Sequence, residues 1–256
     1  MNKIEVVNDV ITNKKLDGAL KLVVDDGTEF MAVKQLKITV VKSTTLKIIY
    51  NGTKSSKLNM IIDVEPNQTL RLEEIHVHDQ IKIQYQYRIL ENAKVKVNRM
   101  AKCHQVRKWD IAYLNGEKAQ FSLCESALAY QEQDDHVLVY HNASHTKSVF
   151  CFRGVTLEHG SIQLSMAGIV ENNMKQCKLE QDGEIISVND QVSDIQTNYV
   201  TEEEKTVKVS SHTALNQGVY DRSKIRQFLM NNIKFTKECQ QVFEKELERL
   251  EVPYES

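Results

Sequence analysis

The sequence predicts an all-β body followed by a small C-terminal helical region. Through most of the chain apolar residues alternate with polar ones, which is the period of a β-strand with one side buried. The predicted strands are short and follow one another at spacings of roughly 8 to 14 residues. After Gly218 the apolar residues recur every three or four positions, as in a helix. Such a body fits a β-sandwich, a β-barrel or a β-solenoid, and no strict sequence repeat selects one of them.

The predicted β body covers residues 1–218. Its first 30 residues are polar and form an edge segment of uncertain structure, in which we expect one or two strands. Beyond this segment, alternation predicts strands around residues 36–40, 46–50, 70–72, 81–89, 95–97, 137–139 and 162–166. The longest run has isoleucine or tyrosine at every second position from Ile81 to Ile89, so one side of this strand faces the interior and the other faces water.

Residues 219–256 form the predicted helical region. Asp221 and Thr236 are each positioned to cap the start of a helix. The apolar residues of these two helices are Ile225, Phe228, Leu229, Cys239, Val242, Phe243, Leu247 and Leu250. Because two short helices cannot bury their own apolar stripe, we expect them to dock on the β body or on a partner.

Composition excludes several classes of protein. The chain has 33 basic and 35 acidic residues, a formal net charge of −2, and no basic patch interleaved with aromatic residues, so we expect no nucleic-acid partner. It lacks the apolar stretch of a signal peptide and of a membrane-spanning helix, so we expect a soluble, cytoplasmic protein that does not enter a membrane. Five cysteines, scattered and never spaced as C-x-x-C, favour reduced thiols.

Two histidine pairs are candidate metal or active sites. His76 and His78 place two imidazoles on the same side of a strand, a geometry that β-sheet metal sites use, but spacing identifies no third ligand. Two exposed strand histidines that bind nothing are the commoner case. His141 and His145 lie in a turn-like cluster, where histidines satisfied by backbone groups are the usual finding.

Signatures of an enzyme are absent. The sequence has no G-x-S-x-G elbow, H-E-x-x-H, P-loop or G-x-G-x-x-G. Carboxylates are plentiful, yet no pair is singled out as the two facing carboxyl groups that polysaccharide cleavage needs. A scaffold without turnover of its own is therefore favoured over an enzyme.

A lone histidine, His212, marks the point at which the β body gives way to helices. Cys177 lies 35 residues before it, and a thiolate and an imidazole can both bind iron. Whether the two side chains meet in space does not follow from their spacing, and a free buried cysteine is the default interpretation of Cys177.

The order of three stretches resembles the SufB/SufD family, the paired β-helix subunits of an iron–sulfur cluster assembly complex. The stretches are His141-Asn-Ala-Ser-His-Thr-Lys-Ser148-Val-Phe-Cys-Phe-Arg-Gly154, Ile185-Ile-Ser-Val-Asn-Asp190 and Lys208-Val-Ser-Ser-His212-Thr-Ala-Leu-Asn-Gln-Gly218. The last is similar to the family's S-H-G-A-x-x-G segment, and the helix start at Tyr220 follows where the family has its own. The resemblance covers about residues 30 to 245.

The resemblance implies a right-handed parallel β-helix core with a small C-terminal helical region. It also implies pairing with a SufB-like subunit and docking of a SufC-like ABC-type ATPase on the helices. In the family, the SufD histidine aligned with His212 lies near the heterodimer interface and takes part in cluster building. The SufB-type cysteine would fall near Gly183 or Glu184, so the chain resembles a short, divergent SufD more than a SufB.

These observations predict a scaffold subunit for iron–sulfur cluster assembly. His212 is the expected interface residue and transient metal ligand, with Cys177 as a weaker candidate. The expected partner-binding residues of the tail are Tyr220, Ile225, Phe228, Leu229 and Phe243. We expect no stably bound cofactor, only a transient iron–sulfur cluster shared with a partner. The sequence leaves open whether the chain forms a homodimer where that partner is missing. The alternative is a β-helix carbohydrate-active enzyme, a lyase or hydrolase, with a carboxylate-lined groove on its flank.

Overall fold

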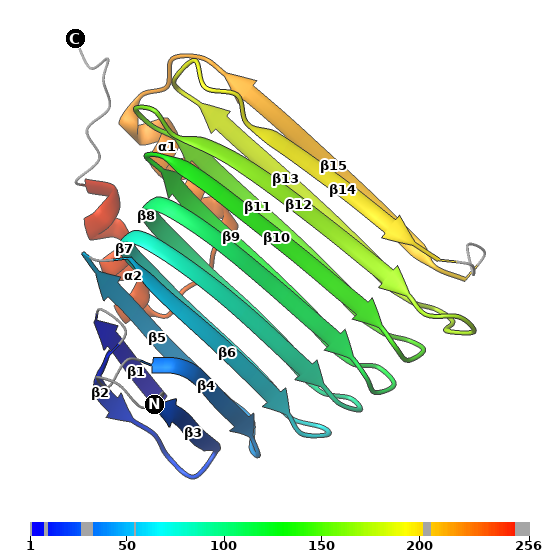
Figure 1. The fold of residues 1–256 in the computed structure, drawn as a ribbon. Helices are drawn as coiled ribbons and strands as arrows, with labels where there is room; N and C mark the ends of the chain where they lie inside the picture. Colours follow the sequence, from blue (N-terminus) through cyan, green and yellow to red (C-terminus); the bar gives the residue numbers. More distant parts are fainter. Residues whose placement is uncertain (1, 8–9, 27–32, 54, 202–205, 249–256) are drawn as a thin grey trace.

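The computed structural model describes residues 2–7, 10–26, 33–53, 55–201 and 206–248 (Figure 1). It is a parallel β-helix of about seven turns with a helical region at its C-terminal end, which confirms the expected fold class. Of the three architectures that fit the strand pattern, the chain therefore adopts the solenoid. Residues 249–256, which include Leu250, lie outside the described residues, as do residues 8–9 and 27–30 of the N-terminal segment.

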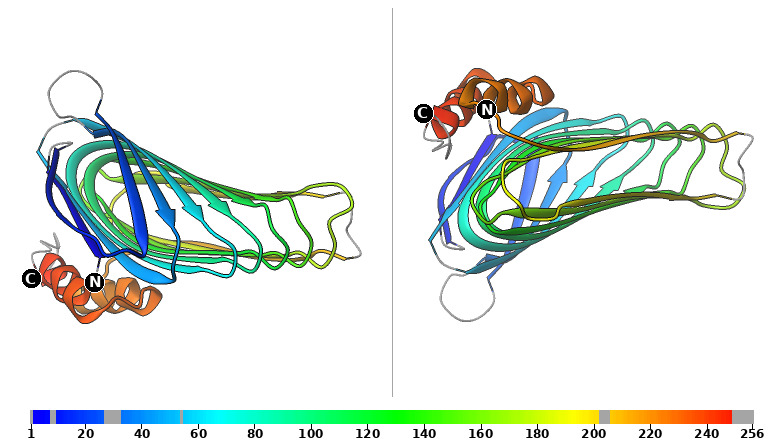
Figure 2. Two further views of the ribbon diagram at one scale, coloured as in Figure 1. Left: turned by 90° about the horizontal axis from the view of Figure 1, so that it is seen from below. Right: turned by 90° about the horizontal axis from the view of Figure 1, so that it is seen from above.

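The strands form two layers that lie face to face (Figure 2). The helix layer, which the helices cover, consists of β1 (Asn2–Val7), β5 (Thr44–Gly52), the first halves of β7 (Thr69–Ile89) and β8 (Lys94–Leu114), β9 (Gln120–Ala129), β11 (Lys147–Thr156), β13 (Lys178–Ser187) and β15 (Lys208–Gln217). The open layer consists of β4 (Val33–Val40), β6 (Ser56–Val64), the second halves of β7 and β8, β10 (Glu132–His141), β12 (Ser161–Val170) and β14 (Asp194–Val200).

The coils stack because equivalent inward positions are apolar from one coil to the next. Leu70 of β7 is the register partner of Val95 in β8, which is in turn the partner of Phe121 in β9, and all three are buried. Each such row buries apolar surface, and the burial stabilises the fold by about 25 cal/mol per Å² of surface removed from water. The alternation that predicted the strands is thus the alternation between the interior of the solenoid and its outside.

The N-terminal segment is more regular than the sequence predicts. Besides β1 it contains β2 (Val10–Lys15) and β3 (Leu20–Asp26), so three strands lie where one or two were expected. Strand β1 pairs in parallel with β5, and its alternate residues Ile4 and Val6 are fully buried. These inward apolar side chains and the ladder to β5 fix this polar segment to the first coil.

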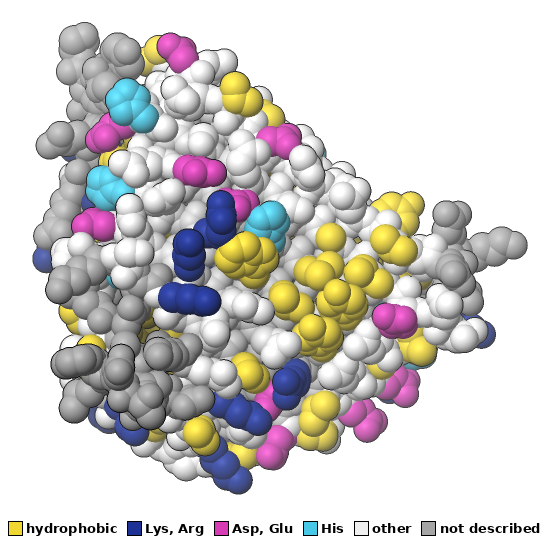
Figure 3. Space-filling model, viewed as in Figure 1, with side chains coloured by type: hydrophobic (Ala, Val, Ile, Leu, Met, Phe, Trp, Pro, Cys, Tyr) yellow, Lys and Arg dark blue, Asp and Glu magenta, His cyan; other side chains and the backbone are white. Residues whose placement is uncertain are grey.

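A flat apolar area lies on the open layer, the face away from the helices (Figure 3). Its outward side chains are half-buried by their neighbours in the next coil. The rings of Tyr113 and Tyr140 stack at 5.1 Å between centroids, and those of Trp109 and His136 stack at 5.6 Å. These pairs are register partners in β8 and β10, so the parallel register itself creates the stacks.

The helical region consists of α1 (Arg222–Asn232) and α2 (Lys237–Glu248), and it docks on the helix layer (Figure 2). Asp221 caps α1 as predicted, because its Oδ1 accepts from the Lys224 backbone N–H at 2.8 Å. Thr236 precedes α2 as predicted, but its hydroxyl donates to Glu73 Oε2 at 2.7 Å. That bond fixes the loop between the helices to β7.

Ile225, Leu229 and Phe243, which we expected to bind a partner, face the solenoid within this chain. All three are buried, and they pack with outward apolar residues of the helix layer such as Ile75 and Met100. The apolar stripe that needed a cover therefore finds it within the chain. Of the five predicted partner-binding residues only Tyr220 and Phe228 remain half-buried.

The C-terminal end of the solenoid is open. Among the described strands, β14 pairs only with β12 and β15 only with β13, so each has one free edge. Apolar side chains are exposed on these two strands and just beyond β15: Tyr199, Val200, Leu215 and Val219. A free edge that carries apolar side chains is a surface to which another strand can add.

Candidate functional site

His212 lies in β15, beside this open end. Its side chain is 70% exposed, and its Nδ1 is 3.1 Å from Oδ1 of Asp182 in the neighbouring strand β13. If Nδ1 carries the ring proton, it donates to the carboxylate, and Nε2 then keeps a free lone pair. A carboxylate behind a histidine fixes the orientation of the ring, and this arrangement is found behind many metal-binding histidines.

His212 is the last member of a row that runs across four strands, which we call the polar ladder: Cys124, Cys151, Asp182 and His212. Successive members are register partners in β9, β11, β13 and β15. Register partners in neighbouring strands lie about 4.8 Å apart, and all four side chains point out of the helix layer. The solenoid thus places two thiols, a carboxylate and an imidazole side by side on one surface.

Arg153 supports the ladder from the side. Its Nη2 is 2.7 Å from Oδ2 of Asp182, and its Nε is 3.4 Å from Oε2 of Glu184. Partial burial raises the pKa of Asp182, but hydrogen bonds from Arg153 and His212 more than offset it, so this pKa lies below its ordinary value. Asp182 is therefore ionised at neutral pH and available to orient His212.

The two thiols of the ladder interact with each other and with the helical region. Cys151 Sγ donates to Oδ1 of Asn232, the last residue of α1, at 2.7 Å, and lies 3.6 Å from Oδ2 of Asp182. The single thiol proton of Cys151 is shared between Asn232 and the Cys124 sulfur, and hydrogen bonding to it lowers the pKa of Cys124. The same interaction, followed by burial, raises the pKa of Cys151. Cys124 is therefore the thiol that ionises first.

The structure does not bring Cys177 to His212. Cys177 precedes β13, is buried, and accepts from the Thr146 hydroxyl at 3.3 Å. The register partner of His212 is Asp182. Asp182 lies five residues after Cys177, and five residues of extended strand span roughly 16 Å. Cys177 belongs to a small apolar cluster with Val170 and Leu179, which agrees with its default interpretation as a buried cysteine.

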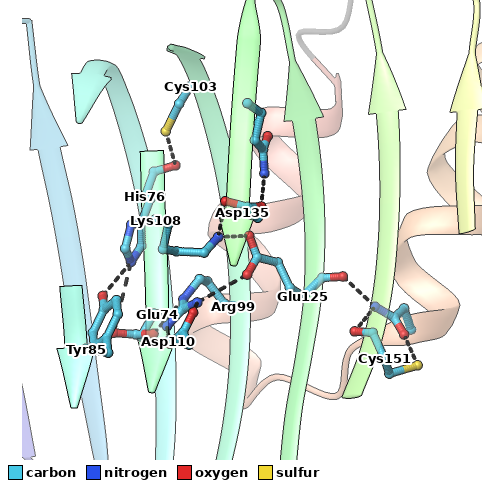
Figure 4. A network of polar contacts seen from close by, with 12 residues as sticks. Glu74, His76, Tyr85, Arg99, Cys103, Lys108, Asp110, Glu125, Asp135 and Cys151 are labelled. Atoms are coloured by element: carbon cyan, nitrogen blue, oxygen red, sulfur yellow. Dashed lines mark hydrogen bonds and ion pairs between the residues drawn. The ribbon is translucent and has the colours of Figure 1, made fainter. Parts of the chain in front are cut away.

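His76 and His78 share one side of β7 as predicted, but they are buried rather than exposed. They point into the solenoid, where His76 Nε2 is 3.2 Å from the hydroxyl of Tyr85 (Figure 4). Burial and the nearby positive charge of Arg99 hold the pKa of His76 well below its ordinary value, so its imidazole is neutral. Within the described residues no three His, Cys, Asp or Glu side chains converge on a metal position.

The histidines border a buried ionic network in the middle coils (Figure 4). Arg99 is fully buried and bonds to three carboxylates: its Nε is 2.8 Å from Glu74, its Nη1 2.6 Å from Asp110 and 3.1 Å from Glu125. Lys108 joins Glu125 to Asp135 on the opposite side of the interior. Burial raises the pKa of Glu74 and of Glu125 despite these cations. These carboxylates pair with cations inside the solenoid and do not line an outer groove.

His141 and His145 have structural roles. His141 is buried, with Nδ1 at 2.7 Å from the Thr146 hydroxyl and Nε2 at 3.0 Å from the Ser148 hydroxyl. His145 occupies the left-handed region with φ 61°, and its N–H donates to the Lys175 carbonyl at 2.8 Å. The partners of His141 are hydroxyls rather than the backbone groups expected.

Sequence reasoning found His212 but missed Cys124, Cys151 and Asp182. A signal was present, because successive members of the ladder are 27, 31 and 30 residues apart, which is one coil each. Using that signal requires knowing that the body is a solenoid, and alternation alone left a sandwich and a barrel open.

Comparison of the chain with protein-family models and with curated proteins finds no match. In the described part of the chain no helix is long and apolar enough to cross a membrane.

Proposed function

We propose that this chain is a scaffold subunit for iron–sulfur cluster assembly, without turnover of its own, and that it works beside a second β-helix subunit of SufB type. The observation that carries this proposal is the position of His212. An imidazole oriented by Asp182 stands on the terminal strand of an open solenoid, where a partner strand would bring its own ligands.

The partner is expected to add at the free edges of β14 and β15. Leu215 is 53% exposed on β15 and Val219, just beyond it, is 78% exposed, and a second solenoid would cover both. Strand addition supplies main-chain hydrogen bonds, and alternate side chains supply specificity. A cluster built there would be shared between the two chains, so the isolated protein is expected to hold none stably.

His212 would act through Nε2. Its Nδ1 faces Asp182 at 3.1 Å, which leaves Nε2 directed away from that carboxylate and able to bind iron as a neutral imidazole. Loss of the Asp182 carboxylate would leave the His212 ring in place but less well oriented. Losing such a supporting group typically lowers metal affinity by about 10–100-fold.

A SufC-type ATPase would dock on the outer side of the helical region. Since Ile225, Leu229 and Phe243 face the solenoid, the contact has to use the exposed face of the helices. Tyr220 and Phe228 pack partly against the same buried cluster and would lie at the border of that contact. Charged residues such as Arg226 surround this face.

Co-expression tests the proposal. The chain is purified together with a SufB-type subunit and a SufC-type ATPase, and cluster formation is followed by absorbance after iron and sulfide are supplied. His212→Ala should lower the cluster yield while the complex is still recovered, and His159→Ala, at an exposed turn, is the matched control. Normal cluster yield with His212→Ala would remove His212 from the mechanism.

Partner recovery is read in the same experiment. Failure of the wild-type chain to retain either partner would overturn the scaffold function itself. Release of reducing or unsaturated ends from a panel of polysaccharides would instead favour the carbohydrate-active enzyme.

A further inference from the structure

Two cysteines of the polar ladder stand side by side without forming a disulfide. Cys124 in β9 and Cys151 in β11 are register partners, both point outward, and both are half-buried. Their Cα atoms are held at the spacing of neighbouring strands, about 4.8 Å. In parallel strands in register the Cβ atoms keep nearly the same separation, which exceeds the mean Cβ···Cβ distance of about 3.8 Å in a disulfide. The geometry therefore favours an ion between the sulfur atoms over a direct bond between them.

The surroundings hold the pair in place. Oδ1 of Asn232 accepts from Cys151, and Nδ2 of the same side chain donates to the Glu125 backbone carbonyl at 2.6 Å, so this amide cannot turn freely. The guanidinium of Arg153 acts on both thiols and favours their anionic forms. Asp182 lies on the other side of Cys151 and is itself neutralised by Arg153.

We propose that Cys124 and Cys151 form a two-thiolate binding site for a soft monovalent cation of the Cu(I) class. Thiolates are soft ligands that select Cu(I), and two of them suffice for its linear coordination. A structural zinc site needs four ligands, and among the described residues no third His, Cys, Asp or Glu converges with these two thiols.

The binding step is a simple exchange of protons for the metal. Each thiol loses one proton, two Cu–S bonds form, and the oxidation state of copper and of sulfur does not change. The bound unit carries one negative charge, which the nearby guanidinium of Arg153 offsets in part while it also pairs with Asp182. Cys151 gives up its bond to Asn232 on binding, so the amide at the end of α1 loses that partner and keeps its bond to the Glu125 carbonyl. This inference depends only on the thiol pair and holds whether or not the chain assembles iron–sulfur clusters.

A competition titration tests the site. The reduced full chain is titrated anaerobically with Cu(I) against a chromophoric Cu(I) chelator, and free thiols are counted before and after. The wild type should bind one Cu(I) and lose two reactive thiols. Cys124→Ser and Cys151→Ser should each bind at least about tenfold more weakly, the smallest effect expected when a metal site loses a supporting group. Cys177→Ser, which removes a buried thiol elsewhere, should bind like the wild type.

Two results would overturn the proposal. One is equal Cu(I) uptake by the wild type and both ladder variants, whose folding is checked by circular dichroism. The other is a mass lower by two hydrogens after exposure to oxidised glutathione, with no Cu(I) binding, which would make the thiols a disulfide-forming pair. Neither the Cu(I) uptake nor the mass measurement depends on cluster yield. Failure of the Cu(I) site and failure of the scaffold function are therefore distinguishable.

Discussion

Arg99 holds three carboxylates together inside the solenoid. It is fully buried and contacts Glu74, Asp110 and Glu125, so its removal leaves carboxylates without their cation in a low-dielectric interior. Breaking a buried ion pair in this way costs about 3–5 kcal/mol. We expect Arg99→Met to lower the free energy of unfolding by that amount in urea denaturation.

The matched control for Arg99→Met is Arg107→Met, eight positions along the same strand. Arg107 pairs with Asp134 on the surface, and its side chain is 48% exposed. Surface ion pairs contribute about 0–1 kcal/mol, so this variant should unfold almost as the wild type does. Equal destabilisation by the two substitutions would mean that the buried network does not stabilise the fold.

His141 gives the stability a pH dependence of known sign. Burial lowers its pKa to about 4, from about 6.5 for an unperturbed histidine. Between these values the unfolded chain binds a proton at this position and the folded chain does not, so stability rises with pH and is lost as the pH falls from 6.5 toward 4. The full difference corresponds to ~3 kcal/mol.

His141→Gln should flatten this part of the profile, measured as the free energy of unfolding in urea between pH 4 and 7. His159→Gln, at an exposed turn, should leave the profile unchanged. An unaltered profile in His141→Gln would assign the acid sensitivity to other groups, of which buried His76 is the first candidate.

Most inward positions could be predicted from the sequence residue by residue, but their pairing could not. Alternation continues through Leu70, Leu72, Glu74, His76 and His78, so it points a glutamate and two histidines inward with the leucines. The cations that pair with these carboxylates come from other strands. Because alternation says nothing about which strand lies opposite, exposed histidines were the natural interpretation.

At the scale of elements, the helical pair is held by a few buried side chains. Phe243 is 1% exposed and meets the ring of Phe235 edge-on at 5.7 Å between centroids. Removing a buried phenylalanine costs about 3–5 kcal/mol. We expect Phe243→Ala to release α1 and α2 from the helix layer while the solenoid stays folded, since the strands are paired with one another and not with the helices.

Hydrogen exchange measures this release. Backbone amides of residues 222–248 should exchange about 100-fold faster or more in Phe243→Ala, because 3 kcal/mol corresponds to about two orders of magnitude. Amides of β7, β8 and β9 should keep their protection. Lys245→Ala, an exposed substitution in the same helix, is the control. Equal loss of protection in helices and strands would show that they unfold as one unit.

The sequence predicts that these two helices exist and where they begin and end. It does not predict which of their faces meets the β body. The cap at Asp221, the threonine that precedes α2 and the spacing of the apolar residues are local signals. Which face meets the body depends on outward apolar residues of β7, β8 and β9, such as Ile75, Met100 and Leu128, which lie more than 90 residues away in the sequence. In an alternating strand these residues occupy the side expected to face water, so nothing local predicted a cover for them.

At the scale of the whole molecule, the choice of solenoid over sandwich or barrel depends on strand order. The coils differ in length: Leu70, Val95 and Phe121 are separated by 25 and 26 residues, whereas Cys151 and Asp182 are separated by 31. Unequal coils conceal a repeat from sequence inspection although the register is continuous. The resemblance supplied the solenoid, and the polar ladder follows from it once each coil is aligned on the next.

An open solenoid has a consequence for association that does not require the partner to be identified. The free edge of β15 presents unpaired main-chain groups beside Leu215, and such edges associate with other strands unless charge or cover prevents it. We therefore expect the isolated chain to self-associate with increasing concentration in sedimentation velocity. Leu215→Lys places a charge on this edge and should weaken self-association by at least about tenfold, or ~1.4 kcal/mol.

Leu90→Lys, at a position 39% exposed on a turn far from the open end, should associate as the wild type does. If both variants associate to the same extent, the edge of β15 is not the surface through which the chain pairs. The position of His212 beside this edge would then no longer support a role at an interface.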